Sequence, residues 1–435
     1  MKFTKHQRLP ISFLVAVIIF GHACGGRVAD PGGPAPVNGS RSSSANNAPI
    51  IIRASDSPAG VDSREPELTA TADGRIILSW VEKLADKRYA LRFAVRDAKA
   101  WSPVGTVAEG ENWFVNWADF PSVIALADGS LAAHWLVKSG TGTYAYDVNI
   151  ARSKDGGKTW GKAIVPHTDG TQTEHGFVSM MPLPDGRVGA VWVDGRNLKD
   201  VKGHEEEGEP LPVSMTLRYA AIDAEGKLSD EAELDERVCE CCQTSAAITA
   251  DGPIAVYRDR SEKEVRDTYV VSNKQGNWSK PRPVFSDNWE INGCPVNGPA
   301  IAADGKRVAV AWYTEANDSP RVKVAFSNDA GATFGKAIEV DDGETRGRVD
   351  ALLLPDGSVL VCWLSGNAEG GAIKVRRVQT DGSLGPPAVI AKTDISRSSG
   401  FPRMARLGDE VHFAWTEFGK PSYVRTATAN ISAYK

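Results

Sequence analysis

Residues 116–135, NWADFPSVIALADGSLAAHW, contain the pattern around which the whole chain is organised. The segment predicts a short apolar strand over Ser122–Leu126, a turn at Asp128-Gly129 and a second strand that ends at Trp135. Asp-Gly between two apolar runs is a strong hairpin signal, because both residues tolerate the positive φ that tight turns need. The segment is therefore predicted to be a β-hairpin.

The same hairpin pattern recurs along the chain. An Asp-Gly turn, reversed to Gly408-Asp409 in the last copy, precedes an aromatic residue by six to eight positions. The aromatic residues lie 51 to 65 residues apart and are Trp80, Trp135, Trp192, Tyr257, Trp312, Trp363 and Trp415. A repeat of about 50 residues with four strands in each copy is typical of a β-propeller. The predicted fold class is all-β, a β-propeller of four-stranded blades with seven repeats.

The chain divides into three parts. Residues 1–23 are predicted to be a signal peptide, because basic residues precede the apolar run Ile11–Phe20, which is too short to span a bilayer as a helix. Residues 24–48 are rich in Gly, Pro, Ser and Asn, and are predicted to be a flexible tether. Residues 49–435 are predicted to form the propeller, with a strand near Ile50–Ala54 completing the last blade and closing the ring.

Export from the cytoplasm follows from the N-terminal segment. Cys24 follows small residues and resembles the acylated cysteine of bacterial lipoproteins. We therefore expect an outer-membrane lipoprotein, periplasmic or on the cell surface, or a secreted protein if no lipid is attached. The lipid is the only expected contact with the membrane, and the protein is expected to be a monomer. The net charge is −5 and no run of Lys or Arg stands out, so nucleic acid is not expected as a partner.

Two short segments resemble a known family. Residues 153–160 (SKDGGKTW) match the Asp-box pattern Ser-x-Asp-x-Gly-x-x-Trp, and residues 327–334 (SNDAGATF) match it with Phe in the last position. Asp-boxes, also called BNR repeats, are typical of the sialidase (neuraminidase) superfamily of propellers, which the chain thus resembles. The resemblance implies a propeller fold and marks no catalytic residue. Sialidases similar to this chain have six blades, so a six-bladed ring is the alternative to seven.

Candidate functional residues gather in one set of loops. In a propeller, the loops that enter the inner strands and those that leave the second strands open on one face, which we call the entry-loop face. Titratable side chains are dense in these loops. They include Arg64, Asp119, Glu174, His175, Asp194, Arg196, Arg258, Tyr313, Glu315, Arg348 and Arg403.

The resemblance to sialidases implies roles for some of them. Arg64 resembles the first arginine of a cluster that binds the substrate carboxylate, and Arg258, Arg348 and Arg403 could complete it. Asp119 resembles the acid/base residue. Tyr313 with Glu315 is the best nucleophile pair among these loops, since sialidases use a tyrosine nucleophile.

Structural interpretations of the same residues stay open. Arg64 and Asp119 could pair with other loop charges, Arg258 could belong to an ion-pair ladder, and Tyr313 could only line the funnel. Glu174 and His175 share an entry loop with His167 and Asp169, and Asp194 and Arg196 lie in an exit loop, so all are candidates for substrate binding.

Cysteines form a second unusual feature. Cys239, Cys241 and Cys242 lie in one entry loop and Cys294 in the next. Outside the cytoplasm such residues usually form disulfides, and a bridge from Cys241 or Cys242 to Cys294 is favoured. A thiolate site for copper or zinc is the alternative. Cys362 lies in an apolar strand and is predicted to be a buried free thiol.

Three functions compete on this basis. The first is a secreted glycoside hydrolase, an exo-α-sialidase acting without a cofactor on terminal sialic acid or a similar acidic sugar in a carbohydrate or glycoconjugate. The second is a non-catalytic propeller that binds glycans or proteins through the same funnel. The third is a metal-dependent or redox propeller that uses the cysteine loops.

Overall fold

The computed structural model describes residues 49–201 and 213–432, which fold into seven antiparallel sheets. The predicted signal peptide, Cys24 and the tether lie outside the described residues. Helical structure among the described residues is limited to two 3₁₀ turns, η1 (Arg196–Leu198) and η2 (Ala316–Asp318). Neither of them could cross a bilayer, since no described helix has the length and apolarity that a span requires.

The first three sheets are named blades 1 to 3 in chain order. Blade 1 consists of β2 (Ser63–Ala70), β3 (Ile76–Lys83), β4 (Tyr89–Arg96) and β5 (Gly105–Gly110). Blade 2 consists of β6 (Ser122–Ala125), β7 (Leu131–Lys138) and β8 (Tyr146–Ser153). Blade 3 consists of β9 (His175–Pro182), β10 (Val188–Asp194), β11 (Met215–Ile222) and β12 (Leu228–Val238).

Blades 4 to 7 follow the same plan. Blade 4 consists of β13 (Ser245–Thr249), β14 (Gly252–Arg258), β15 (Thr268–Lys274), β16 (Asn277–Trp278) and β17 (Arg282–Pro283). Blade 5 consists of β18 (Ala300–Asp304), β19 (Arg307–Thr314), β20 (Arg321–Ser327) and β21 (Ile338–Glu339). Blade 6 consists of β22 (Thr345–Leu353), β23 (Val359–Asn367), β24 (Gly370–Val378) and β25 (Ala388–Thr393). Blade 7 consists of β26 (Arg403–Leu407), β27 (Glu410–Glu417), β28 (Tyr423–Asn430) and β1 (Ile52–Ser55).

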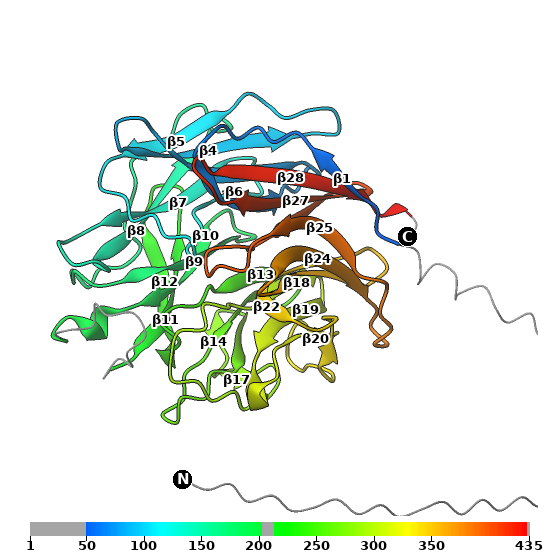
Figure 1. The fold of residues 1–435 in the computed structure, drawn as a ribbon. Coiled ribbons are helices and arrows are strands. Elements are labelled where there is room, and N and C mark those ends of the chain that lie inside the picture. The colour runs from blue at the N-terminus through cyan, green and yellow to red at the C-terminus, as the bar shows by residue number, and fades with distance from the viewer. Residues whose placement is uncertain (1–48, 202–212, 433–435) are drawn as a thin grey trace, which may run out of the picture. The chain divides into compact units, whose positions relative to one another are not determined.

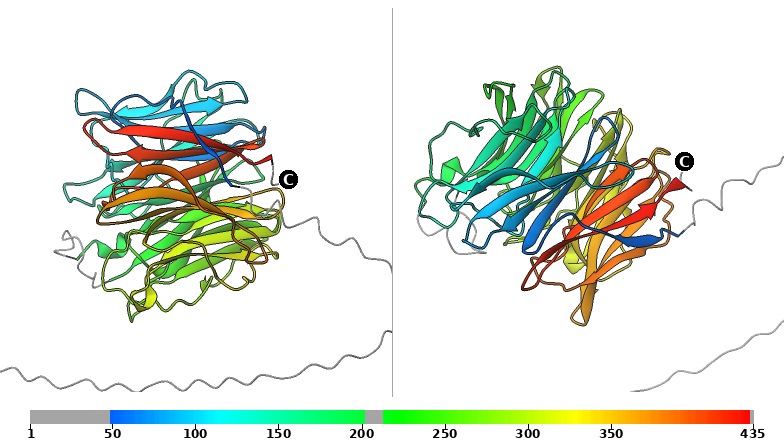
Figure 2. Two further views of the ribbon diagram at one scale, coloured as in Figure 1. Left: turned by 45° about the vertical axis from the view of Figure 1, so that its right-hand side comes forward. Right: turned by 90° about the horizontal axis from the view of Figure 1, so that it is seen from above.

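The seven blades form a closed ring around their inner strands. Each inner strand contacts the inner strand of the next blade, in the order β2, β6, β9, β13, β18, β22, β26 and back to β2. The ring therefore has seven blades, as the repeat predicts, and the six-bladed alternative is wrong. The N-terminal strand also lies where it was predicted, since β1 pairs antiparallel with β28, from Ile52 opposite Ala429 to Ser55 opposite Thr426. Figures 1 and 2 show β1 and β28 side by side.

The second strand of each blade supplies most of the core. In β10 every residue is buried, and in β23 the first seven are. Their sequences are nearly continuous apolar runs, because a strand packed between neighbouring blades has both faces covered. The aromatic residues of the repeat lie here, and Trp80, Trp192, Trp312 and Trp363 are among the largest fully buried side chains. They hold adjacent blades together.

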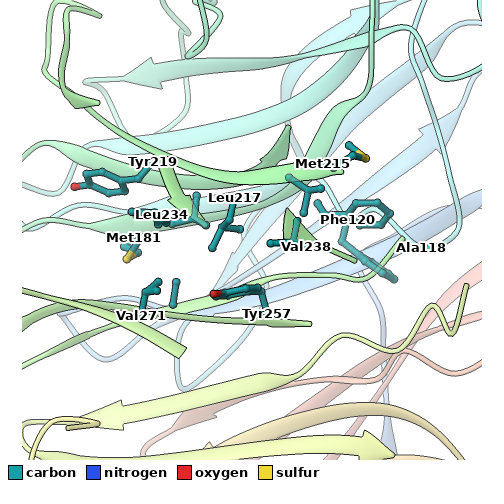
Figure 3. Close-up of a cluster of buried hydrophobic side chains, with 14 of the residues drawn as sticks. Ala118, Phe120, Met181, Met215, Leu217, Tyr219, Leu234, Val238, Tyr257 and Val271 are labelled. Carbon is teal, nitrogen blue, oxygen red and sulfur yellow. The ribbon is translucent and has the colours of Figure 1, made fainter. Parts of the chain in front are cut away.

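One inter-blade core is drawn in Figure 3. Met181, Leu217 and Tyr219 of blade 3 face Tyr257 and Val271 of blade 4. Phe120 and Ala118, from the loop that enters blade 2, belong to the same cluster. The apolar contact thus runs from the blade interface to the centre of the ring, directly beneath the entry loops.

The two segments that match the Asp-box pattern adopt the same hydrogen bonding. In residues 153–160, Ser153 donates to Asp155 over 2.8 Å, and the backbone N–H of Thr159 donates to the same carboxylate over 2.9 Å. In residues 327–334 the equivalent bonds, from Ser327 and Thr333 to Asp329, measure 2.7 and 2.9 Å. These bonds close a tight turn after the third strand. In blade 2, one bridge between Ile150 and Ile164 takes the place of a fourth strand.

Candidate functional site

A cavity of about 880 Å³ runs along the ring axis and is lined by all seven inner strands. At the Asp-Gly turns its lining includes Gly74, Asp304 and Gly408. At the entry-loop end its lining includes Asp119, Phe120, Phe177, Gln243, Arg348, Phe401 and Arg403. Phe120 and Phe401 pack together with ring centroids 5.2 Å apart. Aromatic rings and charged groups therefore meet at the entry-loop end of the axis.

Asp119 is one of the acidic residues that line this cavity, together with Glu67 and Asp350. It comes just before β6 and is 2% exposed. Its Oδ2 accepts a hydrogen bond of 2.7 Å from the backbone N–H of Phe177 in β9. Burial raises the pKa of Asp119 to about 7, although the hydrogen bond from Phe177 opposes the shift. At neutral pH the carboxyl therefore holds a proton part of the time, as a general acid must.

Tyr146 and Glu174 form a second acidic group beside Asp119. The Tyr146 hydroxyl donates to Oε1 of Glu174 over 2.8 Å, and a parallel backbone bridge fixes the two residues side by side. Burial raises the pKa of Glu174 to about 8, the hydrogen bond from Tyr146 opposes the rise, and the charge of Asp119 adds to it. Gly176 lies between the carboxyl of Asp119 and the side chain of Tyr146. A Cβ there would collide with Oδ2 of Asp119 and lie 2.9 Å from the Tyr146 hydroxyl oxygen.

Glu65 and Arg64, in β2, extend this cluster. Burial raises the pKa of Glu65 well above its usual range; the charge of Arg64 opposes the rise and that of Asp119 adds to it. The Nε of Arg64 is buried and has no hydrogen-bond partner in the described part of the chain. A buried guanidinium N–H without an acceptor is costly, and an acceptor on a bound ligand would satisfy it. We call Glu65, Asp119, Tyr146 and Glu174 the acid cluster.

A stacked histidine pair lies next to the acid cluster, behind Glu174. The rings of His167 and His175 are 3.7 Å apart and nearly parallel, with an interplanar angle of 7°. The carboxylate of Asp169 approaches both rings, at 3.2 Å from Nδ1 of His167 and 3.3 Å from Nε2 of His175. Asp147 lies at the opposite edge, 3.6 Å from Nδ1 of His175.

The pKa values of the two rings are shifted in opposite directions. Burial lowers the pKa of His175, but the carboxylates of Asp169 and Asp194 outweigh burial and raise it overall. Burial and the charge of His175 lower the pKa of His167 to about 4. An imidazole nitrogen binds a metal in the plane of its ring, and two parallel stacked rings cannot both do so for one ion. The stacking therefore does not suit one ion bound through both rings, and the shifts in pKa favour a proton on His175 over one on His167.

Asp194, at the end of β10, and Arg196, just after it, lie next to this histidine pair. Arg196 donates to Asp194 through Nε and Nη2, each over 2.7 Å, and Trp192 donates to the same carboxylate over 2.8 Å. Asp194 is fully buried, and its Oδ1 lies 3.8 Å from Nε2 of His175. The candidates His175, Asp194 and Arg196 are thus brought together in one network.

The candidate arginines do not come together as one exposed site for a carboxylate. Arg258 is 1% exposed and donates to the backbone oxygens of Asn297, Arg266 and Tyr313. Arg403 pairs with Glu67 at 2.7 Å. These two guanidinium groups therefore have partners within the protein.

Arg348 differs from them because part of its guanidinium is unsatisfied. It donates to the backbone oxygens of Val296 and Arg397, while its Nε has no hydrogen-bond partner among the described residues. It also lies over Trp117, 5.7 Å from the ring centroid, and Arg397 approaches that ring at 5.9 Å. Trp117 is only partly buried. A partly exposed indole flanked by guanidinium groups is suited to stacking against a sugar ring and attracting an acidic one.

Tyr313 and Glu315 also meet, as the sequence suggests. The Tyr313 hydroxyl donates to Oε2 of Glu315 over 3.1 Å. Burial raises the pKa of Tyr313, and the charge of Glu315 adds to the rise. Glu315 itself is exposed. Tyr313 packs edge-on against Trp289, with ring centroids 5.6 Å apart.

The five cysteines of the described residues are free thiols, so the favoured disulfide to Cys294 is not formed. The sulfur of Cys239 lies 3.8 Å from that of Cys241 and 3.5 Å from that of Cys242, too far for a disulfide bond of about 2.05 Å. Cys362 is buried and free, as predicted.

Sequence analysis missed Tyr146, the phenol closest to the predicted acid. Tyr146 begins β8, a third strand, whereas only the loops next to first and second strands were searched. The available signal was the segment Tyr144-Ala145-Tyr146, which ends the loop after β7 on the same face.

Comparisons with known proteins leave the family of this chain open. No family model matches the sequence, and no curated protein matches it. Solved structures do match. A protein of unknown function from Dyadobacter fermentans DSM 18053 is 16% identical, with a TM-score of 0.48, over 88% of this chain and 98% of that one.

Two enzymes of known activity show similar likeness. The NanB sialidase of Streptococcus pneumoniae is 11% identical, with a TM-score of 0.45, over 88% of this chain and 93% of that one. The α-L-arabinanase of Penicillium chrysogenum is 14% identical, with a TM-score of 0.46, over 74% of this chain and 95% of that one. Likeness at this level carries no argument about function, which is argued below from the residues themselves.

Proposed function

We propose that the protein is a glycoside hydrolase that removes a terminal acidic sugar, sialic acid or a close relative, from a glycoconjugate. The observation that carries the proposal is the acid cluster around Asp119, the member of the cluster that lines the axial cavity. It combines two carboxyls whose pKa values are raised to about 7 and about 8 with a tyrosine hydroxyl hydrogen-bonded to one of them. Carboxyls that exchange protons near neutral pH are what general acid–base catalysis requires.

Each group has a role in this proposal. Asp119 donates its proton to the glycosidic oxygen as the bond to the anomeric carbon breaks. The oxygen of Tyr146 attacks that carbon while Glu174 takes the hydroxyl proton. Water then releases the sugar from Tyr146, with Asp119 acting as base. A tyrosine nucleophile departs from the usual pair of carboxylates and is the route that sialidases use.

Recognition of the acidic sugar is assigned to the guanidinium groups around this cluster. Arg64 and Arg348 each have an Nε that is buried without a hydrogen-bond partner in the described residues. A substrate carboxylate would supply the missing acceptors. Trp117 offers a partly exposed ring for the apolar face of the sugar. The proposal places the protein outside the cytoplasm, with residues 1–23 removed and Cys24 carrying a lipid.

The test uses protein that begins at Pro49 and measures release of fluorophore from an aryl α-sialoside and an aryl β-glucuronide. Turnover of either one by the wild type, lost in Asp119→Asn, supports the proposal and identifies the sugar. If the folded wild type turns over neither substrate, the hydrolase is wrong. Sialyl-oligosaccharide binding that persists in Asp119→Asn would then identify a non-catalytic binding propeller instead.

A further inference from the structure

A cluster of four thiols lies beside the acid cluster on the entry-loop face. Cys239, Cys241 and Cys242 occupy the loop between β12 and β13, and their sulfurs all lie within 4.8 Å of one another. Cys294, in the loop between β17 and β18, interacts with the thiol of Cys241. Two separate loops thus place a group of three thiols, and a fourth thiol that interacts with one of them, at the junction of blades 4 and 5.

We propose that these thiols bind one thiophilic metal ion with a filled d shell, Zn²⁺ or Cu⁺, through Cys239, Cys241 and Cys242, with Cys294 as the fourth ligand. The distances favour this assignment. Thiolates bound tetrahedrally at about 2.3 Å from zinc are about 3.8 Å from one another. The observed separations of 3.5 and 3.8 Å match that spacing. This proposal is independent of the proposed glycoside hydrolase activity.

Two of the sulfurs accept hydrogen bonds from N–H donors. The backbone N–H of Asn297 donates to the sulfur of Cys242 over 3.4 Å, and Nη1 of Arg266 donates to that of Cys239 over 3.2 Å. N–H donors of this kind stabilise metal-bound sulfur and orient it. Arg266 is 0% exposed, so its charge acts on the cluster with little screening by water.

The charges also balance around the site. Three or four thiolates on a single cation leave excess negative charge that must be neutralised in a buried site. Arg266 lies on one side of the cluster, and the charges of Arg258 and Arg348 act on it from the other. Glu240, between two of the ligands, binds Arg266 at 3.1 Å. An apolar thiol pocket would need no such ring of guanidinium groups.

A bound ion would have a mechanical consequence at the entry-loop face. It would tie the loop before β13 to the loop before β18, the one that carries Asn297 and Val296. Arg348 donates to the backbone oxygen of Val296, and Arg258 donates to that of Asn297. The ion would therefore brace the two loops that hold these guanidinium groups in place.

The first experiment measures metal content directly. Protein beginning at Pro49 is produced with zinc and copper supplied, purified without chelator under anaerobic conditions, and analysed by mass spectrometry for metal and for free thiols. We expect one ion per chain. Substoichiometric metal together with a disulfide in the intact mass would overturn the proposal. The metal analysis also shows whether the bound ion is zinc or copper.

Cobalt provides a second readout that does not depend on any variant. The metal is removed with chelator and reductant, and Co²⁺ is added to the apoprotein. Stoichiometric binding with intense sulfur-to-cobalt charge-transfer absorption and tetrahedral d–d bands is expected. Their absence in protein that is folded by circular dichroism would contradict the site.

Three cysteine variants test the ligand assignment. Cys241→Ser and Cys294→Ser should each weaken metal binding by at least about 10-fold. Cys362→Ser is the matched control, because this buried thiol lies outside the cluster, with its sulfur near the backbone oxygen of Asp350. It should bind metal as the wild type does. Equal loss in all three variants would show that metal binding follows general stability and would reject the assignment.

Discussion

Two tyrosine–glutamate hydrogen bonds lie on the entry-loop face, one between blades 2 and 3 and the other in blade 5. Tyr146 and Glu174 are 2.8 Å apart, and Tyr313 and Glu315 are 3.1 Å apart. The two pairs differ in burial and in their neighbours. Glu174 shares a low-dielectric site with Asp119 and keeps its proton to about pH 8, whereas Glu315 is exposed to water. The same two functional groups therefore have different chemistry.

In the proposed mechanism the environment, and not the pairing itself, separates the two tyrosines, since burial and the charges of Glu174 and Asp119 raise the pKa of Tyr146 and the phenol must therefore lose its proton to a neighbouring carboxyl. A carboxyl whose pKa lies near the working pH can accept the phenol proton and return it. Asp119, beside Tyr146, adds a second group that can hold the proton the leaving sugar needs. Around Tyr313 burial and the charge of the exposed Glu315 raise the pKa of the phenol, and the charges of Arg346 and Arg258 oppose the rise. Four predictions test this difference.

The largest effect is expected from removing each phenol in turn. Tyr146→Phe should reduce kcat/KM on the substrate identified above by at least about 10³-fold, since it removes the proposed nucleophile. Tyr313→Phe should stay within about 3-fold of wild type. Steady-state kinetics measures kcat/KM for both variants. The opposite ranking would transfer the nucleophile to blade 5.

The second largest effect is expected on the pH dependence of turnover, which should depend on Glu174 and not on Glu315. Below about pH 7 both Asp119 and Glu174 are protonated and no base remains; above about pH 8 both are ionised and no acid remains. Between these values the pair holds one proton, and the proposed mechanism uses the minority form in which Asp119 is protonated and Glu174 is ionised. A bell-shaped profile of kcat/KM with its maximum between these values is expected, with apparent pKa values that belong to the pair. Glu174→Gln should abolish the bell, and Glu315→Gln should leave it in place. A flat wild-type profile from pH 6 to 9 would argue against the coupled pair.

The free energy of unfolding should depend on pH through the carboxyl of Asp119. Because the pKa of Asp119 is higher in the folded protein than in the unfolded chain, the folded state binds the extra proton between about pH 4 and 7. This contribution to the free energy of unfolding is fully present below pH 4 and is lost as the pH rises through about 7, by up to about 1.4 kcal/mol per pH unit.

Asp119→Asn removes that titration while keeping an acceptor for the N–H of Phe177. The difference in urea midpoint between wild type and Asp119→Asn should therefore change steadily from pH 4 to pH 7. A constant difference across this range would show that the carboxyl titrates normally in the folded protein.

The smallest effects concern the stability of the phenol variants. Tyr146→Phe leaves a partly buried carboxyl of Glu174 without its donor and should cost about 1 to 3 kcal/mol. Tyr313→Phe leaves Glu315 in water and should cost about 0.5 kcal/mol or less. Urea denaturation at pH 6 measures both. Equal costs would mean that the two pairs are solvated alike.

Sequence predicts the ring well because each blade repeats a local signal. The Asp-Gly turns and the aromatic residues that follow them depend on neighbours within one hairpin, so their spacing reveals the blades. The predicted strand Ser122–Leu126, for example, is β6, which spans Ser122–Ala125. Closure through β1 was predictable because the last repeat lacks an outer strand.

The site was less predictable because its groups meet across blades. Tyr313 and Glu315 are two residues apart in one chain segment, so the sequence shows their pairing. Tyr146 and Glu174 are 28 residues apart and meet only because β8 of blade 2 lies against the entry to β9. Arg258 was a candidate by its loop position, yet backbone oxygens of three residues engage it. Burial and long-range contacts of this kind have no local signature.

Ring closure by β1 has a consequence for how the protein is made. Blade 7 contains the first described strand of the chain and the last one, because Ile52 pairs with Ala429. The ribosome emits β1 several hundred residues before β28, so during synthesis the early strand has no partner and the ring stays open. The pairing of β28 with β1 is therefore the step that closes the ring.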